Sequence, residues 1–306
     1  MIRIEDISHV RFAAPDLDLM SGFLETFGLS RAAGAPDRLF FRGAGTAPFV
    51  HVTERGEAGF KALGLRAESP ADLETLARET GATVEALDAP GGGQVVRLTD
   101  PDGNLVEVVA GQTQVEPLPL AAVTPWNTAD SRPRQRQVKR TGAGPAQVLR
   151  LGHAVLDVSD FRASERWYKD RFGFLTSDEI RLGPDFALGA FLRCDRGTTL
   201  TDHHTLFLLQ NPKGPGFNHA AFEVRDLDDL MRGHAHLKAS GATPQWGVGR
   251  HILGSQVFDY WFDPFGHPLE HWTDGDLFTA EDPPAINGPQ ELLGVQWGQA
   301  FPQPGF

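Results

Sequence analysis

The octapeptide Asp100-Pro-Asp-Gly-Asn-Leu-Val-Glu107 returns later in the chain as Asp263-Pro-Phe-Gly-His-Pro-Leu-Glu270. Both copies share the frame D-P-x-G-x-x-x-E, in which Asp-Pro and Gly form a turn and the apolar strand that follows carries a glutamate. The beginnings of the two halves also match, because Ile7-Ser-His9-Val-Arg-Phe resembles Leu151-Gly-His153-Ala-Val-Leu. The sequence therefore predicts a duplicated fold whose two halves contain comparable strands.

Each half also contains two helical stretches that begin at an Asp or Ser and end at a Gly. The four predicted helices run over residues 16–28, 69–81, 160–173 and 226–241. Asp and Ser are favoured before the first helical turn, and glycine is favoured after the last one. Because each helix follows a short strand and precedes several strand-like segments, we expect four strand–helix–strands modules. These modules cover residues 4–57, 58–112, 149–211 and 216–274.

The modules pair into two domains of an α+β fold. Residues 1–112 form the predicted N-terminal domain, and residues 149–275 form the predicted C-terminal domain. Between them, residues 113–148 are rich in Pro, Thr, Ala and Arg and are expected to be a linker. Residues 276–306 are expected to form a tail that packs on the C-terminal domain. At 306 residues the chain is long enough for each domain to bury its own core.

The composition favours a globular protein that binds a small molecule. There are 40 acidic and 28 basic side chains, and the resulting net charge of −12 disfavours a nucleic-acid partner. The one basic run, over residues 132–140, lies in the linker and is typical of a solvated segment. The chain lacks an apolar run of the roughly 18 residues that a membrane-spanning helix requires, so we expect no membrane partner.

The start of the chain and its cysteine content predict a cytoplasmic location. Residues 1–10 (MIRIEDISHV) read as the start of a strand and lack the pattern of a signal peptide. The single cysteine, Cys194, has no partner for an internal disulfide, which fits a reducing compartment.

Eleven histidines are present, and most of them taken singly favour a structural role. His234 and His236 lie in the fourth predicted helix and are expected to face solvent, whereas His51 is expected to pack in a first-domain strand. His153 and His219 differ, because they occupy the same place in the first strands of modules three and four. Glu270 lies on the last strand of module four.

These three residues have the chemistry of an open metal site. If the paired modules curl toward each other, the side chains of His153, His219 and Glu270 point into one shared cavity. Two imidazoles and one carboxylate on one side of a metal form the facial triad of non-haem Fe(II) enzymes, which leaves positions free for substrate and O2. A structural zinc site would more often use cysteines and close its coordination shell.

The first half provides an internal comparison for this site. His9 matches His153 and Glu107 matches Glu270, but the place of His219 falls at about Gly64. We therefore expect no comparable metal in the N-terminal domain.

Three further polar residues gather in the second half. His203 and His204 open an apolar strand together, so only one of them is expected to face the cavity. His251 ends the string Gly-Arg-His, and Tyr260 lies just before the Asp263 turn. On its own, Tyr260 would be interpreted as a half-buried strand aromatic.

The strings GHAVL, HHTL, NHAAFEV, GRH and Y-x-x-D-P-x-G-x-x-x-E resemble those of type I extradiol ring-cleavage dioxygenases, which belong to the vicinal oxygen chelate superfamily. The resemblance covers nearly the whole chain. It implies two domains, each of two βαβββ modules forming a curled mixed sheet around a central cavity, as in glyoxalases. It also implies a homo-oligomer with one Fe(II), or alternatively Mn(II), in the C-terminal domain and no cofactor besides the metal.

Carried over by motif, His153, His219 and Glu270 would be the metal ligands and His204 the catalytic acid–base residue. His251 and Tyr260 would hydrogen-bond a substrate oxygen. The implied reaction opens a catechol ring with O2 next to the diol, in the degradation of aromatic compounds. The alternatives are a glyoxalase-like isomerase and a non-catalytic small-molecule-binding protein of the same fold.

The sequence does not select the catechol. The chain has Gly254-Ser-Gln256 where relatives commonly have a Ser-Asn pair, and this departure bears on substrate identity more than on reaction type. Aromatic residues would line an apolar pocket or belong to the core: Phe186, Phe191, Trp246 and Phe258. Arg250 is expected to be structural rather than the partner of a substrate carboxylate.

Overall fold

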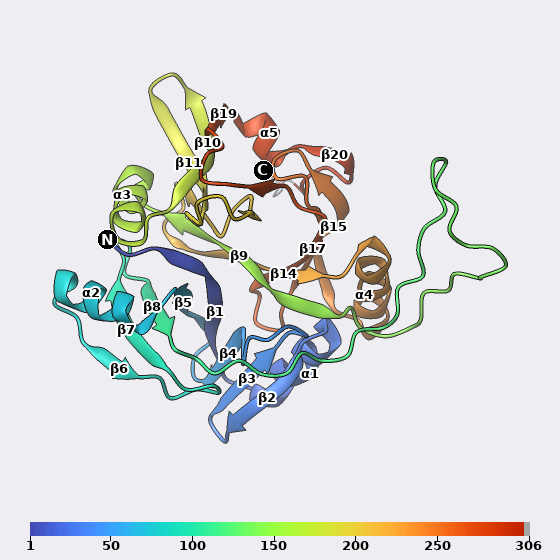
Figure 1. Ribbon diagram of the computed structural model, residues 1–306, viewed down its shortest axis with the longest axis horizontal. Coiled ribbons are helices and arrows are strands. Elements are labelled where there is room, and N and C mark those ends of the chain that lie inside the picture. The colour runs from blue at the N-terminus through green and yellow to red at the C-terminus, as the bar shows by residue number, and fades with distance from the viewer. Residues whose placement is uncertain (303–306) are drawn as a thin grey trace.

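Each half of the chain folds into one curled mixed sheet with helices on its outer face (Figure 1). The computed structural model describes residues 1–302. The first module contains β1 (Ile4–Ala14), α1 (Leu17–Phe27), β2 (Ser30–Ala35), β3 (Arg38–Arg42) and β4 (His51–Arg55). The second contains β5 (Gly59–Ala67), α2 (Pro70–Thr80), β6 (Val84–Ala86), β7 (Gln94–Thr99) and β8 (Leu105–Ala110).

The second half repeats this order after the linker. The third module contains β9 (Val148–Val158), α3 (Phe161–Phe172), β10 (Leu175–Gly183), β11 (Phe186–Arg193), β12 (Thr201–Asp202) and β13 (Leu206–Gln210). The fourth contains β14 (Gly216–Val224), α4 (Leu227–Ser240), β15 (Thr243–His251), β16 (Val257–Phe262) and β17 (Pro268–Thr273). The tail contains β18 (Leu277–Phe278), β19 (Ala285–Asn287), α5 (Pro289–Leu293) and β20 (Val295–Gly298).

The strand order confirms the predicted α+β fold of paired βαβββ modules. Within residues 1–302 the first sheet runs β2-β3-β4-β1-β5-β8-β7-β6, and the second runs β19-β10-β11-β13-β9-β14-β17-β16-β15-β20. In each sheet the two modules meet through their first strands, which pair antiparallel as β1 with β5 and β9 with β14. Each first strand also pairs in parallel with the last strand of its own module.

All four predicted helices are confirmed, together with their capping residues. Asp16 precedes α1, and its carboxylate accepts hydrogen bonds from the backbone N–H groups of Asp18 and Leu19. Gly28 ends the same helix in the left-handed conformation, with φ at 108°. A side chain at Gly28 would also collide with the backbone of Ala146, so this glycine both stops the helix and admits a close contact.

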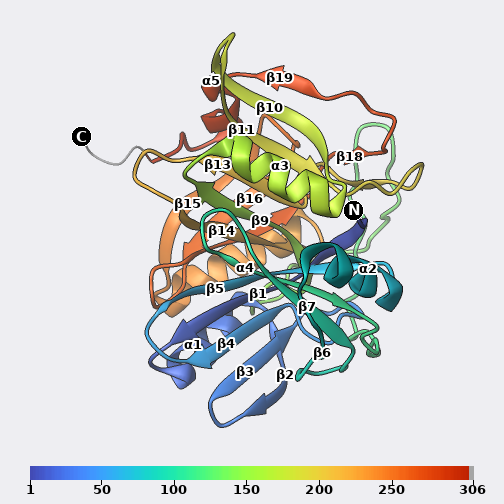
Figure 2. The same cartoon turned by 90° about the vertical axis from the view of Figure 1, so that its left-hand side faces the viewer.

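The two sheets share one hydrophobic core and lie one above the other in Figure 2. Aromatic contacts cross between the halves, because Phe12 packs edge-on against Phe217 with ring centroids 5.0 Å apart. The ring of His271 stacks on Phe27 at 3.9 Å, and its Nε2 donates to the Phe27 carbonyl oxygen at 2.7 Å. These contacts bring the N-terminal domain directly against the back of the sheet that carries the candidate site.

The tail completes the second sheet at both of its edges. β19 pairs in parallel with β10 at one edge, and β20 pairs antiparallel with β15 at the other. Between them α5 crosses the open side of the curled sheet (Figure 1). Within residues 1–302, every helix is too short or too polar to span a membrane.

Candidate active site

His153, His219 and Glu270 lie on three neighbouring strands at the centre of the second sheet, β9, β14 and β17. Ala221 of the middle strand is opposite both His153 and Glu270 in the strand register. His219 precedes Ala221 by two residues and so points to the same face of the sheet. Strand pairing therefore brings together three residues that are separated by as many as 117 positions in the sequence (270 − 153).

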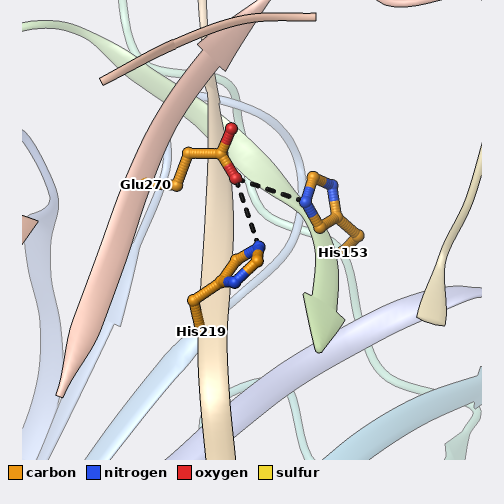
Figure 3. Close-up of side chains that lie close together, drawn as sticks. All are labelled: His153, His219 and Glu270. Carbon is orange, nitrogen blue, oxygen red and sulfur yellow. Dashed lines mark ion pairs between the residues drawn. The ribbon is translucent and has the colours of Figure 1, made fainter. Parts of the chain in front are cut away.

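The ligand atoms of these residues converge on one point (Figure 3). Glu270 Oε2 lies 3.3 Å from His153 Nε2 and 3.4 Å from His219 Nε2. Donor atoms roughly 2.1 Å from one ion and at right angles to each other are about 3 Å apart, which is close to these distances. All three donors lie within 4.8 Å of one another.

Burial and charge indicate that this arrangement suits a cation. Glu270 is fully buried, and neither of its carboxylate oxygens accepts a hydrogen bond within the described part of the chain. A buried carboxylate without a donor is costly, and a bound cation would offset that cost. Burial also lowers the pKa of His153 and of His219 to about 3, which keeps both imidazoles in the neutral form that binds a metal. The residues present therefore fit a divalent metal ion.

A second layer of hydrogen bonds orients His219. Its Nδ1 donates to Asn218 Oδ1 at 2.8 Å, and Asn218 Nδ2 donates to Asp157 Oδ1 at 3.1 Å. These two hydrogen bonds hold the proton of His219 on Nδ1 and leave the lone pair of Nε2 facing Glu270. Sequence reasoning missed Asn218; the signal available was an amide residue directly before a candidate ligand histidine.

The other predicted site residues lie around the same centre. Tyr260 is opposite Glu270 in the pairing of β16 with β17, and its hydroxyl lies 3.1 Å from His251 Nε2. His251 Nε2 is itself 3.9 Å from Glu270 Oε1. The ring of His204 packs on the ring of His153, with centroids 3.9 Å apart. The structure thus gathers five polar side chains around Glu270, although the chain separates them widely.

These residues face a cavity of about 420 Å³. Its wall is largely apolar and comes from both the sheet and the tail: Val155, Phe191, Phe207, Leu209, Phe217, Trp246, Leu253, Leu292, Leu293 and Phe301. The tail residues are held by pairing of β20 with β15 and by Trp246, whose Nε1 donates to the Gln299 carbonyl oxygen at 2.9 Å. Sequence reasoning did not identify the tail as part of the cavity wall.

One expectation about the aromatic residues needs correction, because Phe186 belongs neither to the cavity wall nor to the buried core. Phe191 and Trp246 line the cavity, but Phe186 is 46% exposed and Phe258 lies in the core behind Trp246. Phe186 follows a turn at the end of β10 and so projects outward. Arg250 lies outside the cavity wall, where it binds the Ser255 carbonyl oxygen and Asp274, in agreement with a structural role.

His234 does not simply face solvent, as the position of its helix had led us to expect. It is half-buried, and its Nδ1 lies 3.1 Å from the buried carboxylate of Asp259. The outer face of the second sheet supplies this partner, which helix periodicity alone does not show.

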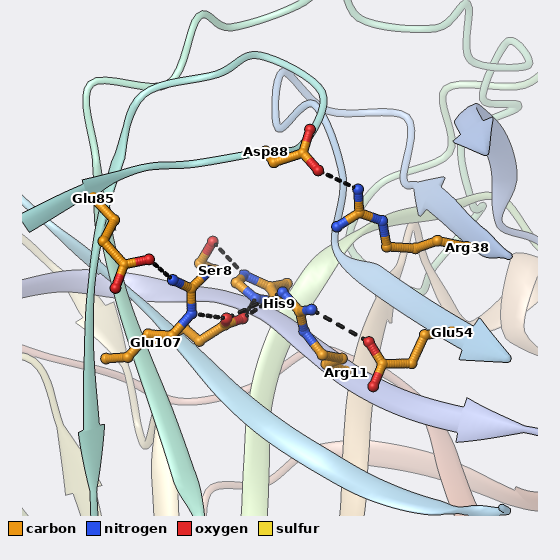
Figure 4. A network of polar contacts seen from close by, with 9 residues as sticks. Ser8, His9, Arg11, Arg38, Glu54, Glu85, Asp88 and Glu107 are labelled. Carbon is orange, nitrogen blue, oxygen red and sulfur yellow. Dashed lines mark hydrogen bonds and ion pairs between the residues drawn. The ribbon is translucent and has the colours of Figure 1, made fainter. Parts of the chain in front are cut away.

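The corresponding place in the first sheet is filled by arginines (Figure 4). Glu107 accepts hydrogen bonds from His9 Nε2 at 2.9 Å, from Arg11 at 2.8 Å and from Arg97 at 2.9 Å. The carboxylate that matches Glu270 thus already accepts hydrogen bonds from three cationic or polar side chains. This geometry is unfavourable for a cation, although the absence of a metal there remains a prediction.

The register corrects the expected counterpart of His219. Gly64 lies opposite both His9 and Glu107 and is therefore equivalent to Ala221. The equivalent of His219 is Ala62, two residues earlier and opposite Arg11. Gly64 is required for another reason, because a Cβ at this position would lie 2.2 Å from the ring of His9.

We expect Glu107→Gln to reduce the free energy of unfolding by roughly 2 to 4 kcal/mol, because it leaves buried donors without their counter-charge. Burial alone raises the pKa of the Glu107 carboxyl, but the hydrogen bond and charge of His9, the charge of Arg11 and the hydrogen bond from Arg97 lower it to about 2. A depressed pKa contributes stability above the unfolded value of about 4.3, and this contribution is lost as the pH falls toward 2. Urea unfolding at several pH values between 7 and 2.5 would measure it.

The matched control is Glu54→Gln, which removes a more exposed partner of the same Arg11 and is expected to cost less than about 0.5 kcal/mol. An equal loss in both variants, or a loss for Glu107→Gln that does not shrink between pH 5 and pH 2.5, would contradict the expectation.

Known proteins similar to this chain include dioxygenases and a glyoxalase. Residues 150–271 match the family described as the Glyoxalase/Bleomycin resistance protein/Dioxygenase superfamily. Metapyrocatechase 2 of Cupriavidus necator is 29% identical, over 98% of this chain and 91% of its own length. The iron-dependent extradiol dioxygenase of Rhodococcus jostii (strain RHA1) is 29% identical over 41% of this chain and 43% of its own length.

A solved structure resembles the chain almost from end to end. The Mn(II)-bound glyoxalase from Novosphingobium aromaticivorans superposes with a TM-score of 0.79 at 26% identity, over 99% of this chain and 94% of that one. The matched family segment includes His153, His219 and Glu270. The predicted resemblance to extradiol ring-cleavage dioxygenases is therefore confirmed: residues 150–271 match the glyoxalase/bleomycin resistance protein/dioxygenase superfamily, and 98% of the chain is similar to a metapyrocatechase.

Proposed function

We propose that this protein opens the ring of a catechol with O2, beside the diol, at a mononuclear Fe(II) centre held by His153, His219 and Glu270. Mn(II) is the alternative ion, because the same ligand set accommodates both. The observation that carries the proposal is a buried two-histidine, one-carboxylate cluster that opens into an apolar cavity with three further hydrogen-bonding residues. When bound, the ion would supply Lewis acidity toward the diol and one-electron chemistry toward O2.

The chain's own residues would bind and orient the substrate. The aromatic and aliphatic wall of the cavity would contact the ring and exclude water, which strengthens the polar interactions inside. The Tyr260 hydroxyl and His251 Nε2, already 3.1 Å apart, would hydrogen-bond one diol oxygen from the β16 side. His219 and Glu270 lie on the strands between these two groups and His153.

His204 would act as the acid–base group that accepts and returns a substrate proton. Its ring lies against His153 on the side of the cavity away from Tyr260, so the two polar groups approach a substrate from opposite sides. An imidazole there would accept a proton from the substrate and return it when a bond to oxygen breaks. His204 is 4% exposed and lines the cavity, and its Nδ1 lies 3.0 Å from His203 Nδ1.

A glyoxalase-like isomerase is the second candidate, because the solved structure that superposes along 99% of this chain is a Mn(II)-bound glyoxalase. Isomerisation would normally consume no O2. The pairing of His251 with Tyr260 and the proximity of His204 favour oxygen chemistry, since they place donors on both sides of the cavity.

Oxygen uptake separates the two reactions. Protein loaded anaerobically with Fe(II), mixed with catechol and then exposed to air, is expected to consume one O2 per ring and form a yellow product. No uptake with any catechol in a panel, despite tight binding of one metal ion, would reject the proposal in favour of the isomerase or of a binding protein.

The cavity wall predicts a preference for uncharged catechols. Among its lining residues within 1–302 there is no Lys or Arg, and one of them, Asp157, carries a carboxylate. We expect kcat/KM for 3-propylcatechol to exceed that for 3,4-dihydroxyphenylacetate by at least about tenfold, because a buried CH2 contributes about 0.8 kcal/mol and an unpaired carboxylate is penalised. Steady-state O2 uptake with unsubstituted catechol as reference measures this ratio, and a ratio near one would disprove the preference.

We further propose a cytoplasmic homo-oligomer that acts in the degradation of aromatic compounds. The linker projects beyond α4 as a long loop (Figure 1), and it exposes large apolar side chains: Leu120, Val123, Trp126 and Val138. Exposed apolar side chains on a projecting segment are typical of a contact between subunits. Light scattering after gel filtration would measure the mass, and a monomer of 33.4 kDa would reject this part of the proposal.

A further inference from the structure

A buried chain of hydrogen bonds leads from the tail to His204. Asn287 of β19 donates from Nδ2 to Asp178 Oδ1 at 2.6 Å, and Asp178 Oδ2 lies 2.6 Å from His203 Nε2. His203 Nδ1 then lies 3.0 Å from His204 Nδ1. Asp178, His203 and His204 are exposed by 7%, 1% and 4%, so the part of this hydrogen-bond network from Asp178 to His204 is shielded from water, whereas Asn287 is half-buried.

The donor and acceptor in each of these hydrogen bonds follow from Asp178, whose carboxylate can only accept. Asp178 accepts at both oxygens, so the proton between Asp178 and His203 belongs to His203 Nε2. A neutral His203 then has a lone pair on Nδ1. Only one proton fits between the two Nδ1 atoms, and it belongs to His204. His204 is left with an unprotonated Nε2, the ring nitrogen that is free to face the cavity.

The surrounding residues are shaped to hold His203 in this place. Gly254 lies against its ring, and a Cβ there would be 2.9 Å from His203 Nδ1. Ser177 fixes the backbone, because its hydroxyl donates to the His203 carbonyl oxygen at 2.6 Å. Phe191 and Phe278 pack on the imidazole, with ring centroids 5.1 and 5.3 Å away. A packed ring with one carboxylate partner has little freedom to reverse its donor and acceptor atoms.

We propose that Asp178 and His203 are positioning residues that fix the tautomer of His204, so that its Nε2 is the proton acceptor in the cavity. The inference rests on the proposed function, in which His204 moves a proton. Neither residue is among those that line the cavity, and neither is one of the three candidate metal ligands. Their effect on the reaction would pass entirely through His204.

Asp178→Asn reverses this arrangement while preserving the shape of the side chain. With Asn287 still donating to Oδ1, the new Nδ2 would donate to His203 Nε2, which moves the proton of His203 to Nδ1. His203 would then donate to His204 Nδ1, and His204 Nε2 would become a donor. We expect kcat with catechol to fall at least about tenfold with KM changed less than about threefold, since a mispositioned general base loses much of its 10²–10⁴-fold contribution.

The matched control is Asp259→Asn, because Asp259 is also a buried carboxylate that binds one histidine, His234, on the outer face of the same sheet. It is expected to keep kcat within about twofold. A double-mutant cycle adds the decisive kinetic test: in a His204→Gln background, Asp178→Asn should cause no further loss of kcat. An equal loss in both backgrounds would assign Asp178 a general structural role and overturn the inference.

Histidine 15N NMR of the full-length, Zn(II)-loaded protein provides a readout that needs no turnover. We expect the proton of His204 on Nδ1 in the wild type and on Nε2 in Asp178→Asn. A proton on Nε2 of His204 in the wild type would overturn the inference even if catechol is cleaved. Failure of the wild type to consume O2 with any catechol would instead reject the proposed function, so the two failures are distinguishable.

Discussion

Glu270→Gln is expected to abolish ring cleavage and to weaken Fe(II) binding by more than about a hundredfold, because loss of a direct ligand should exceed the 10- to 100-fold cost of losing an outer-shell partner. The carboxylate supplies the only negative charge among the three candidate ligands. Isothermal titration under anaerobic conditions would measure the affinity, and O2 uptake would measure the activity.

The same substitution should leave the metal-free protein as stable as the wild type, or more stable. The Glu270 carboxylate is fully buried and accepts no hydrogen bond within residues 1–302, so its replacement by a neutral amide removes an uncompensated charge. Chemical unfolding of both apo proteins tests this point. Glu281→Gln, at an exposed position in the tail, is the control and should change neither binding nor stability. Retained affinity in Glu270→Gln would remove this residue from the metal site.

His204→Phe is expected to lower kcat by about 10²- to 10⁴-fold while the protein keeps its metal. The planar ring of Phe fits beside Phe191, so the cavity wall is preserved, but the nitrogen that accepts the proton is lost. Elemental analysis would give the metal content, and steady-state O2 uptake at saturating catechol would give kcat.

The control is His236→Phe on the outer helix α4, which changes the same residue type far from the cavity and should leave kcat unaltered. If His204→Phe turns over at the wild-type rate, His204 has no part in the reaction, and the role inferred for Asp178 and His203 fails with it.

Local signals in the sequence specified much of this protein. The helices begin at Asp16, Ser69, Asp160 and Asp226 and end at the four predicted glycines, because capping depends on residues within one turn of the helix end. The repeated D-P-x-G-x-x-x-E frame fixed the turn before β8 and β17, and with it the place of each glutamate on its strand. The types of the candidate ligands and their order along the chain were likewise readable from the sequence.

Only the tertiary structure decided how distant segments meet. Strand pairing set the register that makes Ala62, rather than Gly64, the counterpart of His219. Strand pairing also brought Arg11 and Arg97 within hydrogen-bond distance of Glu107. The tail residue Asn287, 109 positions from Asp178, reaches the hydrogen-bond chain behind His204 for the same reason. Such contacts depend on the curvature and edges of a complete sheet, and one strand's sequence contains no information about which strand lies beside it.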